Sequence, residues 1–516
     1  MAQADDLQWA LTQFTCKRME AYKIYREYYD GVHKLAFATE KFRNTFGQMF
    51  KEFSENACRT VVDSLADRLN VTGFDTGQAK TDTQEIPIQL PPGTPDMSRS
   101  KVVTKDPLGD QMWEIWESNK MDRKATKVHK ESLRMGDSYV IVWPGPDGEA
   151  KIWPQKGDRC IVRYDDETSE MIELASKIWY DDVELQWYLN LYYPDMPIQK
   201  YKMKKKGQGV SFGAAPREWE AYDAVDNPYG RVPMFHFPNA AICELGVSEL
   251  KDLIPLQNGL NKSVMDMMIA MEFASFKQRW AIGLEVEIDP ETGEPLDPNA
   301  KNYGVDRLLA FPDPETKVGE FGSTDLDQFL RVTDKFWTSI AKISGTPLHY
   351  FFITTGDFPS GNAMRAAEGK FVNKIQDRQE GFGDSWADVL KFAVKVEGTD
   401  ADDEKVETTW SDAAQPSEAE IADTAVKKKA VGVSRTQILK ELDYDDDEIM
   451  QMLQESDSDA LQQSFLKMQM SPGPFGGESG PGSPSGTSGP GGNPALNPNG
   501  QPIPGPGKRP GRGVRA

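Results

Sequence analysis

The residue types that carry enzyme chemistry are present in this chain, but they do not form a familiar catalytic pattern. Gly356 and Gly361 have the glycine spacing of a phosphate-binding loop, but Asn362 follows where that motif requires lysine. The four histidines are far apart, and neither H-E-x-x-H nor G-x-S-x-G occurs. Four acidic residues at 445–448 lie in one predicted helical turn, where solvated carboxylates are favoured and do not converge on one ion. We therefore predict that the protein is not an enzyme and that it has no cofactor and no metal site.

Composition narrows the class of protein further. The chain has 516 residues, enough for roughly two to four domains, and a formal net charge of -22. No run of apolar residues is long enough to span a membrane, and the first residues lack the pattern of a signal peptide, so we expect no membrane segment and synthesis in the cytoplasm. The four scattered cysteines are expected to be free thiols. Because proteins that hold DNA tightly are usually basic, this acidic chain is not expected to do so.

Three long amphipathic helices are the central predicted elements. Apolar residues recur every three or four positions over 248–279, over 323–344 and from 362 to about 398. Gly345, followed by Pro347, is a typical stop signal for the second helix. A helix of about 30 residues is about 45 Å long, which is more than a small globular domain needs. Such helices either cross a large domain or pack beside copies of themselves.

The rest of the chain is predicted to mix helices with strands, which makes the fold class α+β and mainly helical. A period of two over 138–206 predicts an antiparallel meander, whereas the polar, proline-rich segment 76–107 is expected to be a long exposed loop. A strand-bearing subdomain is predicted at 281–322, and a disordered Gly/Pro-rich tail at 471–516. Further helices are expected at 5–29, 49–69, 109–119, 122–135 and from residues 417, 434 and 445, and short strands at 71–74 and 406–410.

Six stretches of this sequence carry a resemblance to a known family. They occur in a characteristic order and spacing, at 28–31, 56–69, 246–250, 256–262, 343–347 and 360–368. Together they resemble the portal proteins of long-tailed double-stranded DNA bacteriophages, especially those of the actinobacteriophage type. The similarity covers about residues 10–455. None of these stretches is a catalytic motif.

The resemblance implies a virion protein that forms a homo-oligomeric ring, typically a dodecamer, at one vertex of the capsid. Double-stranded DNA would pass through the ring during packaging and ejection, without sequence-specific contacts. The expected partners are the major capsid protein, the terminase large subunit, a head–tail adaptor and a scaffold protein. By this resemblance the wing is residues 1–245, the first stem helix 246–279, the clip 280–322 and the second stem helix 323–345. The channel loop is 346–361, and the helix that returns to the wing is 362–398. The wing strand and the crown helices are 399–470, and the tail is 471–516.

Two groups of residues are the candidates for contact with DNA under this resemblance. The first lies in the channel loop and comprises Thr346, His349, Tyr350, Phe351, Phe352, Thr354, Thr355, Asp357 and Ser360. The second could present basic rings to the channel and comprises Lys262, Lys277, Arg279, Lys370, Lys374 and Arg378. The alternative for the basic residues is ion pairing between subunits or a solvated helix face. A ring of copies that each carry a charge of -22 should repel DNA, which would let a duplex slide.

Two other functions stay open from the sequence. The chain could be a different virion structural protein, such as a head–tail adaptor, although adaptors are usually much shorter. It could also be a metal-dependent packaging nuclease that uses some of its 81 acidic residues, although no motif selects a pair of them.

Overall fold

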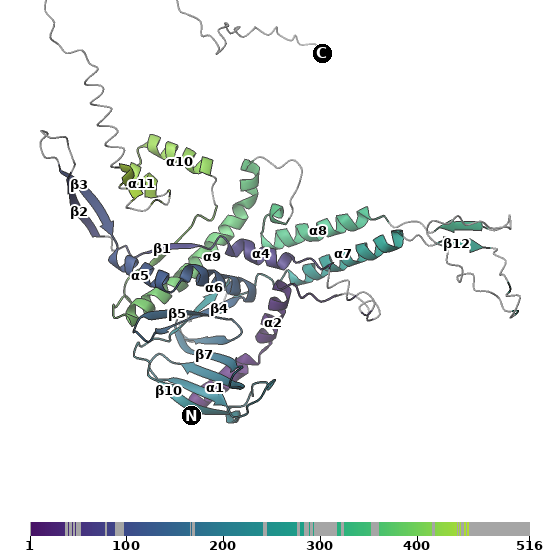
Figure 1. Ribbon diagram of the computed structural model, residues 1–516, viewed down its shortest axis with the longest axis horizontal. Coiled ribbons are helices and arrows are strands. Elements are labelled where there is room, and N and C mark those ends of the chain that lie inside the picture. The colour runs from purple at the N-terminus through teal and green to yellow at the C-terminus, as the bar shows by residue number, and fades with distance from the viewer. Residues whose placement is uncertain are drawn as a thin grey trace, which may run out of the picture. The chain divides into compact units, whose positions relative to one another are not determined.

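The structure is a computed structural model in which helices and antiparallel strands are mixed (Figure 1). It describes residues 2–36, 53–77, 80–87, 98–165, 171–240, 245–275, 279–282, 317–320, 325–351, 361–414 and 418–440, together with a few isolated positions. The chain divides into two compact units, Met1–Pro416 and Ser417–Ala516. The predicted tail at 471–516 lies outside the described residues.

The N-terminal segment forms two helices, α1 (Ala2–Phe14) and α2 (Lys17–Tyr29), so the prediction of one helix over 5–29 is wrong. Cys16 has an extended backbone, with φ -75° and ψ 164°, and it separates the two helices. The break allows each helix to join a different core. Leu11 of α1 packs among buried residues of a five-stranded sheet, whereas Tyr28 of α2 packs in the main helical core.

The next helices follow the predicted pattern closely. They are α4 (Ala57–Ala66), α5 (Pro107–Ser118) and α6 (Met121–Met135). The side chain of Asn56 accepts a hydrogen bond from the backbone N–H of Arg59 and caps α4, which begins later than expected. The predicted strand at 71–74 is β1 (Val71–Asp75). It pairs antiparallel with β14 (Glu407–Trp410), the strand predicted at 406–410.

The predicted loop over 76–107 is instead a β-hairpin for much of its length. Strands β2 (Lys80–Pro87) and β3 (Ser98–Lys105) pair antiparallel, with Lys80 opposite Lys105 and Pro87 opposite Ser98. Its prolines led to the wrong prediction, because Pro87 stands at the last position of β2 and Pro107 opens the helix that follows β3, so neither interrupts a strand. The β-branched Thr81, Thr83, Val102 and Val103 favour the extended backbone that the structure adopts.

The predicted meander over 138–206 is divided between two sheets, so its description as one meander needs correction. A three-stranded sheet has the order β11-β4-β5, and a five-stranded sheet has the order β10-β9-β8-β7-β6, with every pair antiparallel. Two of these strands, β10 and β11, were not predicted. The strands are β4 (Asp137–Pro144), β5 (Ala150–Gln155), β6 (Cys160–Tyr164), β7 (Ile172–Asp181), β8 (Gln186–Tyr192), β9 (Ile198–Met203), β10 (Trp219–Val225) and β11 (Met234–Pro238).

Strand β4 explains this division, because both of its faces are buried. Val140 and Val142 face the helical core, whereas Tyr139 and Ile141 pack against residues of the five-stranded sheet. A strand covered on both faces needs partners on two sides. The helices cover one face of β4, and the five-stranded sheet covers the other.

The first long helix is α7 (Ile254–Ser275), which is shorter at both ends than predicted. Residues 249–253 are in turns, and Pro255 falls in the first helical turn, where its missing N–H breaks no hydrogen bond. At the other end, β12 (Arg279–Ile282) pairs antiparallel with β13 (Lys317–Glu320), which bounds the subdomain predicted at 281–322. The strand sequences expected within that subdomain lie largely outside the described residues.

The other two long helices agree well with their predictions. Helix α8 (Asp327–Ser344) ends at Gly345, whose φ of 75° is the left-handed conformation expected of a C-terminal glycine. Helix α9 (Gly361–Val396) is continuous through Gly383. A Cβ on Gly383 would lie 3.3 Å from Nε1 of Trp410, so this glycine allows α9 to approach β14 closely.

The main core surrounds α9. Phe371, Phe382 and Trp386 of this helix are fully buried, and Trp386 packs edge-on against Trp116 with ring centres 5.0 Å apart. The second unit contains α10 (Glu418–Val431) and α11 (Arg435–Lys440). Ser434 caps α11 by accepting a hydrogen bond from the N–H of Gln437, as its sequence predicts. No helix in the described part of the chain has the length and apolar character needed to cross a membrane.

Candidate functional site

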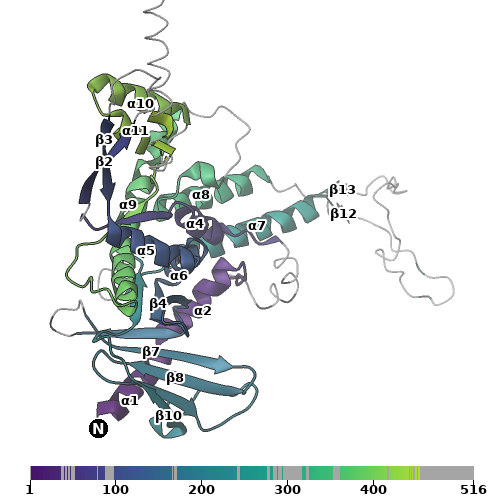
Figure 2. The ribbon, with the colours of Figure 1, turned by 60° about the vertical axis from the view of Figure 1, so that its left-hand side comes forward.

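Helices α7 and α8 lie side by side and run in opposite directions, joined through β12 and β13 (Figures 1 and 2). They are in close contact at Gly259, where a Cβ would lie only 2.5 Å from Cε1 of Phe336. Thr333, Ile340 and Ser344 form the buried stripe of α8. Glycine at 259 therefore allows this close approach.

Both α7 and α8 carry more apolar side chains than their contact with each other can bury. Residues 264–271 of α7 read Val-Met-Asp-Met-Met-Ile-Ala-Met, with apolar side chains on every side of the helix, and positions 266–270 are only half-buried. On α8, Leu330, Val332 and Ile343 are 51%, 46% and 52% exposed. A helix that is apolar all round is normally buried. The described part of one chain does not bury this surface.

The segment after α8 is the base of the predicted channel loop. Thr346 is buried, and residues Leu348–Tyr350 form a short 3-10 helix. Nε2 of His349 lies 3.1 Å from Oε1 of Glu368 on α9, and the ring of Phe351 packs against Trp337 of α8 with centres 5.3 Å apart. Four of the nine predicted loop residues thus sit at an ordered base. The other five, Phe352, Thr354, Thr355, Asp357 and Ser360, lie outside the described residues.

Arg68, which follows α4, holds this base in place. Its guanidinium donates a hydrogen bond to the hydroxyl of Tyr350 and lies 3.8 Å from Oε2 of Glu368. A second N–H group donates to the carbonyl of Ala413 over 2.8 Å. The guanidinium also covers the ring of Phe371 at 5.7 Å. One side chain therefore connects the loop base, α9 and the segment that follows β14.

Lys374 and Arg378 of α9 bind the carboxylate of Glu249 inside the same chain. The Nζ of Lys374 contacts Glu249 Oε2 and donates to the carbonyl of Ser344 over 2.8 Å, and Nη2 of Arg378 lies 3.2 Å from Glu249 Oε1. Burial opposes ionisation of Glu249, but the two adjacent cations outweigh it and lower the pKa of the carboxyl. These two basic candidates are thus held in an ion-pair network that joins α9 to the start of the α7 segment.

The other basic candidates are placed differently. Lys262 pairs with Asp266 one turn along α7, and Lys370 is exposed on α9. Arg279 opens β12 opposite Glu320, and Lys277 lies outside the described residues. The structure therefore does not bring the six basic candidates together within one chain, and their place along a channel stays a prediction.

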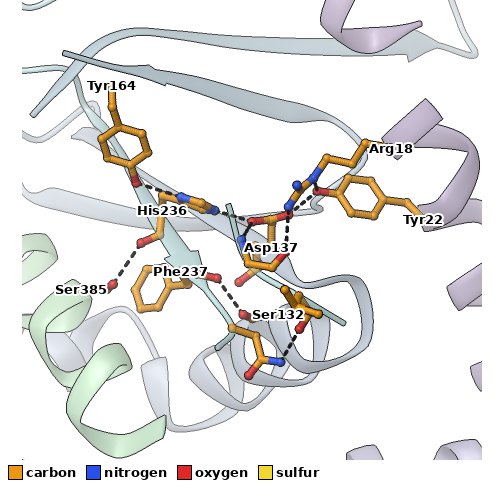
Figure 3. Close-up of polar contacts among 12 residues, drawn as sticks. Arg18, Tyr22, Ser132, Asp137, Tyr164, His236, Phe237 and Ser385 are labelled. Atoms are coloured by element: carbon orange, nitrogen blue, oxygen red, sulfur yellow. Dashed lines mark hydrogen bonds and ion pairs between the residues drawn. The ribbon is translucent and has the colours of Figure 1, made fainter. Parts of the chain in front are cut away.

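A second polar cluster joins α2 to both sheets (Figure 3). The buried carboxylate of Asp137 accepts hydrogen bonds from His236 Nε2 over 2.8 Å and from the N–H of Gly246 over 2.9 Å, and it also contacts Arg18 and Tyr22. Burial would raise the pKa of Asp137, but the hydrogen bond and charge of His236, together with Arg18, lower it to about 2. This carboxylate anchors the segment that leads into α7.

Sequence reasoning missed Asp137 as a functional position, and it included Arg68, Glu249 and Glu368 in the resembling stretches without assigning them a role. Each is a common charged residue, and its side-chain partners lie ten or more positions away in the sequence, so no local pattern marks it. The unusual feature is burial, which the sequence does not show. Among the described residues, no three His, Cys, Asp or Glu side chains lie close enough together to hold a metal ion.

A family model described as "Phage portal protein, SPP1 Gp6-like" matches residues 18–462. The class is thus that of phage portal proteins, which are structural virion components rather than enzymes. Within that class the chain belongs to the SPP1 Gp6-like family. The resemblance predicted from the six sequence stretches is thereby confirmed.

Two curated relatives carry the same description. The portal protein of Mycobacterium phage D29 is 24% identical over 399 residues, which is 75% of each chain. The portal protein of Mycobacterium phage L5 is 25% identical over 379 residues, covering 72% of this chain and 71% of the relative. Both relatives come from phages of mycobacteria, in agreement with the actinobacteriophage type predicted from the sequence.

Two solved structures are also similar. A chain of "Virion of native gene transfer agent (GTA) particle" has a TM-score of 0.37 and 10% identity, over 74% of this chain and 87% of that one. A chain of "Neck of empty GTA particle computed with C6 symmetry" has a TM-score of 0.34 and 12% identity, over 60% and 75%.

Proposed function

We propose that copies of this portal protein pack side by side into a closed ring, a dodecamer, at one capsid vertex, and that double-stranded DNA passes through its channel during packaging and ejection. The observation that supports this proposal is the apolar surface of α7 and α8 that the described part of one chain leaves uncovered. Leu330 and Val332 are two positions apart, so they project about 200° apart, on either side of the stripe that packs on α7. Two different apolar flanks on one helix suit a head-to-tail contact that repeats around a ring.

The proposal assigns roles to the chain segments. Helices α7 and α8 form the stem, residues 280–322 the clip that meets the terminase large subunit and later the head–tail adaptor, and 346–361 the channel loop. Residues 1–245 and 362–398, with β14, form the wing that meets the major capsid protein and a scaffold protein. The helices beyond residue 417 form the crown.

Among the basic candidates, Lys370 is the best placed to face DNA, because its side chain is exposed on α9 near the loop base. Lys374 and Arg378 are engaged by Glu249, so in this proposal they hold α9 in position. Lys262, Lys277 and Arg279, on or just after α7, would face neighbouring copies or the channel.

Negative-stain electron microscopy of the purified full-length protein tests the ring directly. We expect annular particles with a central opening. A protein that stays monomeric at high concentration and in capsids would contradict the proposal. Incubation with plasmid DNA and Mg²⁺ tests the nuclease alternative, for which cleavage would be required.

Charge placed on one flank at a time tests the geometry of the contact. In a ring, each contact joins the Leu330 flank of one copy to the Val332 flank of the next, so Leu330→Asp and Val332→Asp should each stay monomeric. An equimolar mixture of the two variants should form only dimers, because one intact flank of each remains. If both flanks instead joined like to like, each variant alone would dimerise. Thr338→Asp, which adds the same charge at an exposed polar position of α8, should still form rings.

A further inference from the structure

One face of α6, with the residue before it, carries a row of cations that have no acidic partner among the described residues. Arg123 and Lys127 are four residues apart and Lys124 lies between them, three before Lys127, so the three lie along one side of the helix, and Lys120 directly precedes its first turn. Lys120, Arg123 and Lys127 are exposed, and Lys124 is half-buried. The apolar residues of the helix, Met121, Ala125, Val128, Leu133 and Met135, are all buried on the opposite side.

This row is unusual in a chain that has 81 acidic and 59 basic residues. Cations near the end of the same helix are paired, since Lys130 lies 2.9 Å from Asp63 and Arg134 contacts Glu131. Within the part of the chain that the structure describes, Lys120, Arg123 and Lys127 form no ion pair, and Lys124 instead donates to the carbonyl of Ile152 over 3.0 Å.

The cations of this row also lie close enough to repel one another. Burial and the charges of Lys151, Lys120 and Lys127 lower the pKa of Lys124. Like charges gathered in this way destabilise the folded chain unless an anion joins them. A gathering of cations of this kind attracts anions.

The backbone of Lys120 supports the same interpretation. Its φ of 56° and ψ of 45° lie in the left-handed region, which glycine or asparagine adopts more easily than lysine does. Asn119, directly before it, is buried because its side chain bonds to Ile115 and to the open edge of β5. A lysine at this strained position adds a charge to the row at a conformational cost.

We propose that this face of α6, defined by Lys120, Arg123, Lys124 and Lys127, binds the phosphate backbone of double-stranded DNA. The face exposes cations and no apolar side chain, so it lacks the apolar anchor of a typical protein interface. Contacts to phosphates need only cations and are independent of sequence. The inference rests on the proposed function in one respect, namely that the assembled protein meets DNA.

The test measures binding of the assembled full-length protein to a short fluorescent duplex of random sequence over a range of salt concentrations. The double variant Arg123→Gln/Lys127→Gln should lower the affinity at least about tenfold and reduce the salt slope by about two, because each lost phosphate contact removes about 0.9. Both side chains are exposed, and electron microscopy and thermal unfolding would confirm that the variant assembles and folds. Arg123→Glu/Lys127→Glu should lower the affinity further.

The control is Lys205→Gln/Lys206→Gln, which removes the same charge from exposed lysines that follow β9. This variant should bind DNA as the unaltered protein does. Three outcomes would overturn the inference: no DNA binding by the unaltered protein, an unchanged affinity in the α6 variant, or an equal loss in both variants. A loss of binding to polyglutamate but not to DNA would also overturn it, in favour of an acidic protein partner. If the α6 variant forms normal rings but binds DNA as the unaltered protein does, this inference is wrong and the proposed ring assembly is unaffected.

Discussion

The indole Nε1 of Trp386 donates a hydrogen bond of 2.8 Å to Nε2 of His129, and neither side chain is exposed to solvent. The histidine ring also stacks on Phe382, with centres 5.3 Å apart and nearly parallel planes. Because Nε2 accepts a hydrogen bond, the imidazole is neutral in the folded protein. The centre of the main core thus depends on a histidine that must stay uncharged.

This histidine should make the stability of the protein sensitive to acid. Burial lowers the pKa of His129 to about 3, against about 6.5 in an unfolded chain. Between these values the unfolded chain binds the proton and the folded chain does not. The free energy of unfolding should therefore fall as the pH falls below about 6.5, by up to about 1.4 kcal/mol per pH unit. Urea unfolding at several pH values measures this loss.

The control for that measurement is His129→Gln, which keeps an acceptor for Trp386 but does not titrate. Its stability should depend less on pH in this range than that of the unaltered protein. Equal pH dependence of the two proteins would show that His129 is not the source.

Replacing Asp137 by alanine should be among the most damaging single changes. It would leave Arg18, His236 and the N–H of Gly246 without their shared acceptor, and loss of one partner of a buried ion pair costs about 3–5 kcal/mol. Asp195→Ala, at an exposed position, should change stability by less than about 0.5 kcal/mol. Chemical denaturation compares the two, and a similar small effect of both changes would contradict the structural role of Asp137.

Two glycine-to-alanine changes should act in opposite directions. Gly259→Ala would place a Cβ against the ring of Phe336 and should destabilise the α7–α8 pair by about 1 kcal/mol or more. Gly369→Ala, in α9 with no atom within 4 Å of the new Cβ, should stabilise by about 0.5–1 kcal/mol. Thermal unfolding gives both signs. Adding Phe336→Leu should recover part of the loss at Gly259, and no recovery would place the clash elsewhere.

Replacing Arg68 by methionine should loosen the loop base. The change removes the hydrogen bonds to Tyr350 and Ala413 and leaves Glu368 with less positive charge nearby, at a cost of about 1–3 kcal/mol. Hydrogen exchange over 346–351 should become faster than in the unaltered protein. Arg331→Met breaks an exposed ion pair with Asp327 and should have almost no effect on this segment. Equal exchange in both variants would refute the role of Arg68.

The parts of the fold that were predicted correctly are those whose signal comes from residues close together in the sequence. The long helices carry their apolar residues every three or four positions, and their ends are marked by local signals such as Gly345 and Ser434. The hairpin at 80–105 was missed because prolines were weighed more heavily than the β-branched residues around them. Strand β11 was missed because its pairing with the distant β4 outweighs its weak local pattern, and β10 because its alternation with its neighbour β9 was not recognised.

By itself, the sequence of this protein determined the α+β class, the three long helices, the acidic character of the chain and the resemblance to phage portal proteins, since all of these depend on composition or on short-range order. Only the tertiary structure decided that β1 pairs with β14, that Glu249 holds Lys374 and Arg378, and that Lys130 of α6 pairs with Asp63. The physical reason is distance along the chain. The partner of a charged side chain is set by which elements pack together, and a single sequence does not show which residues that packing brings into contact.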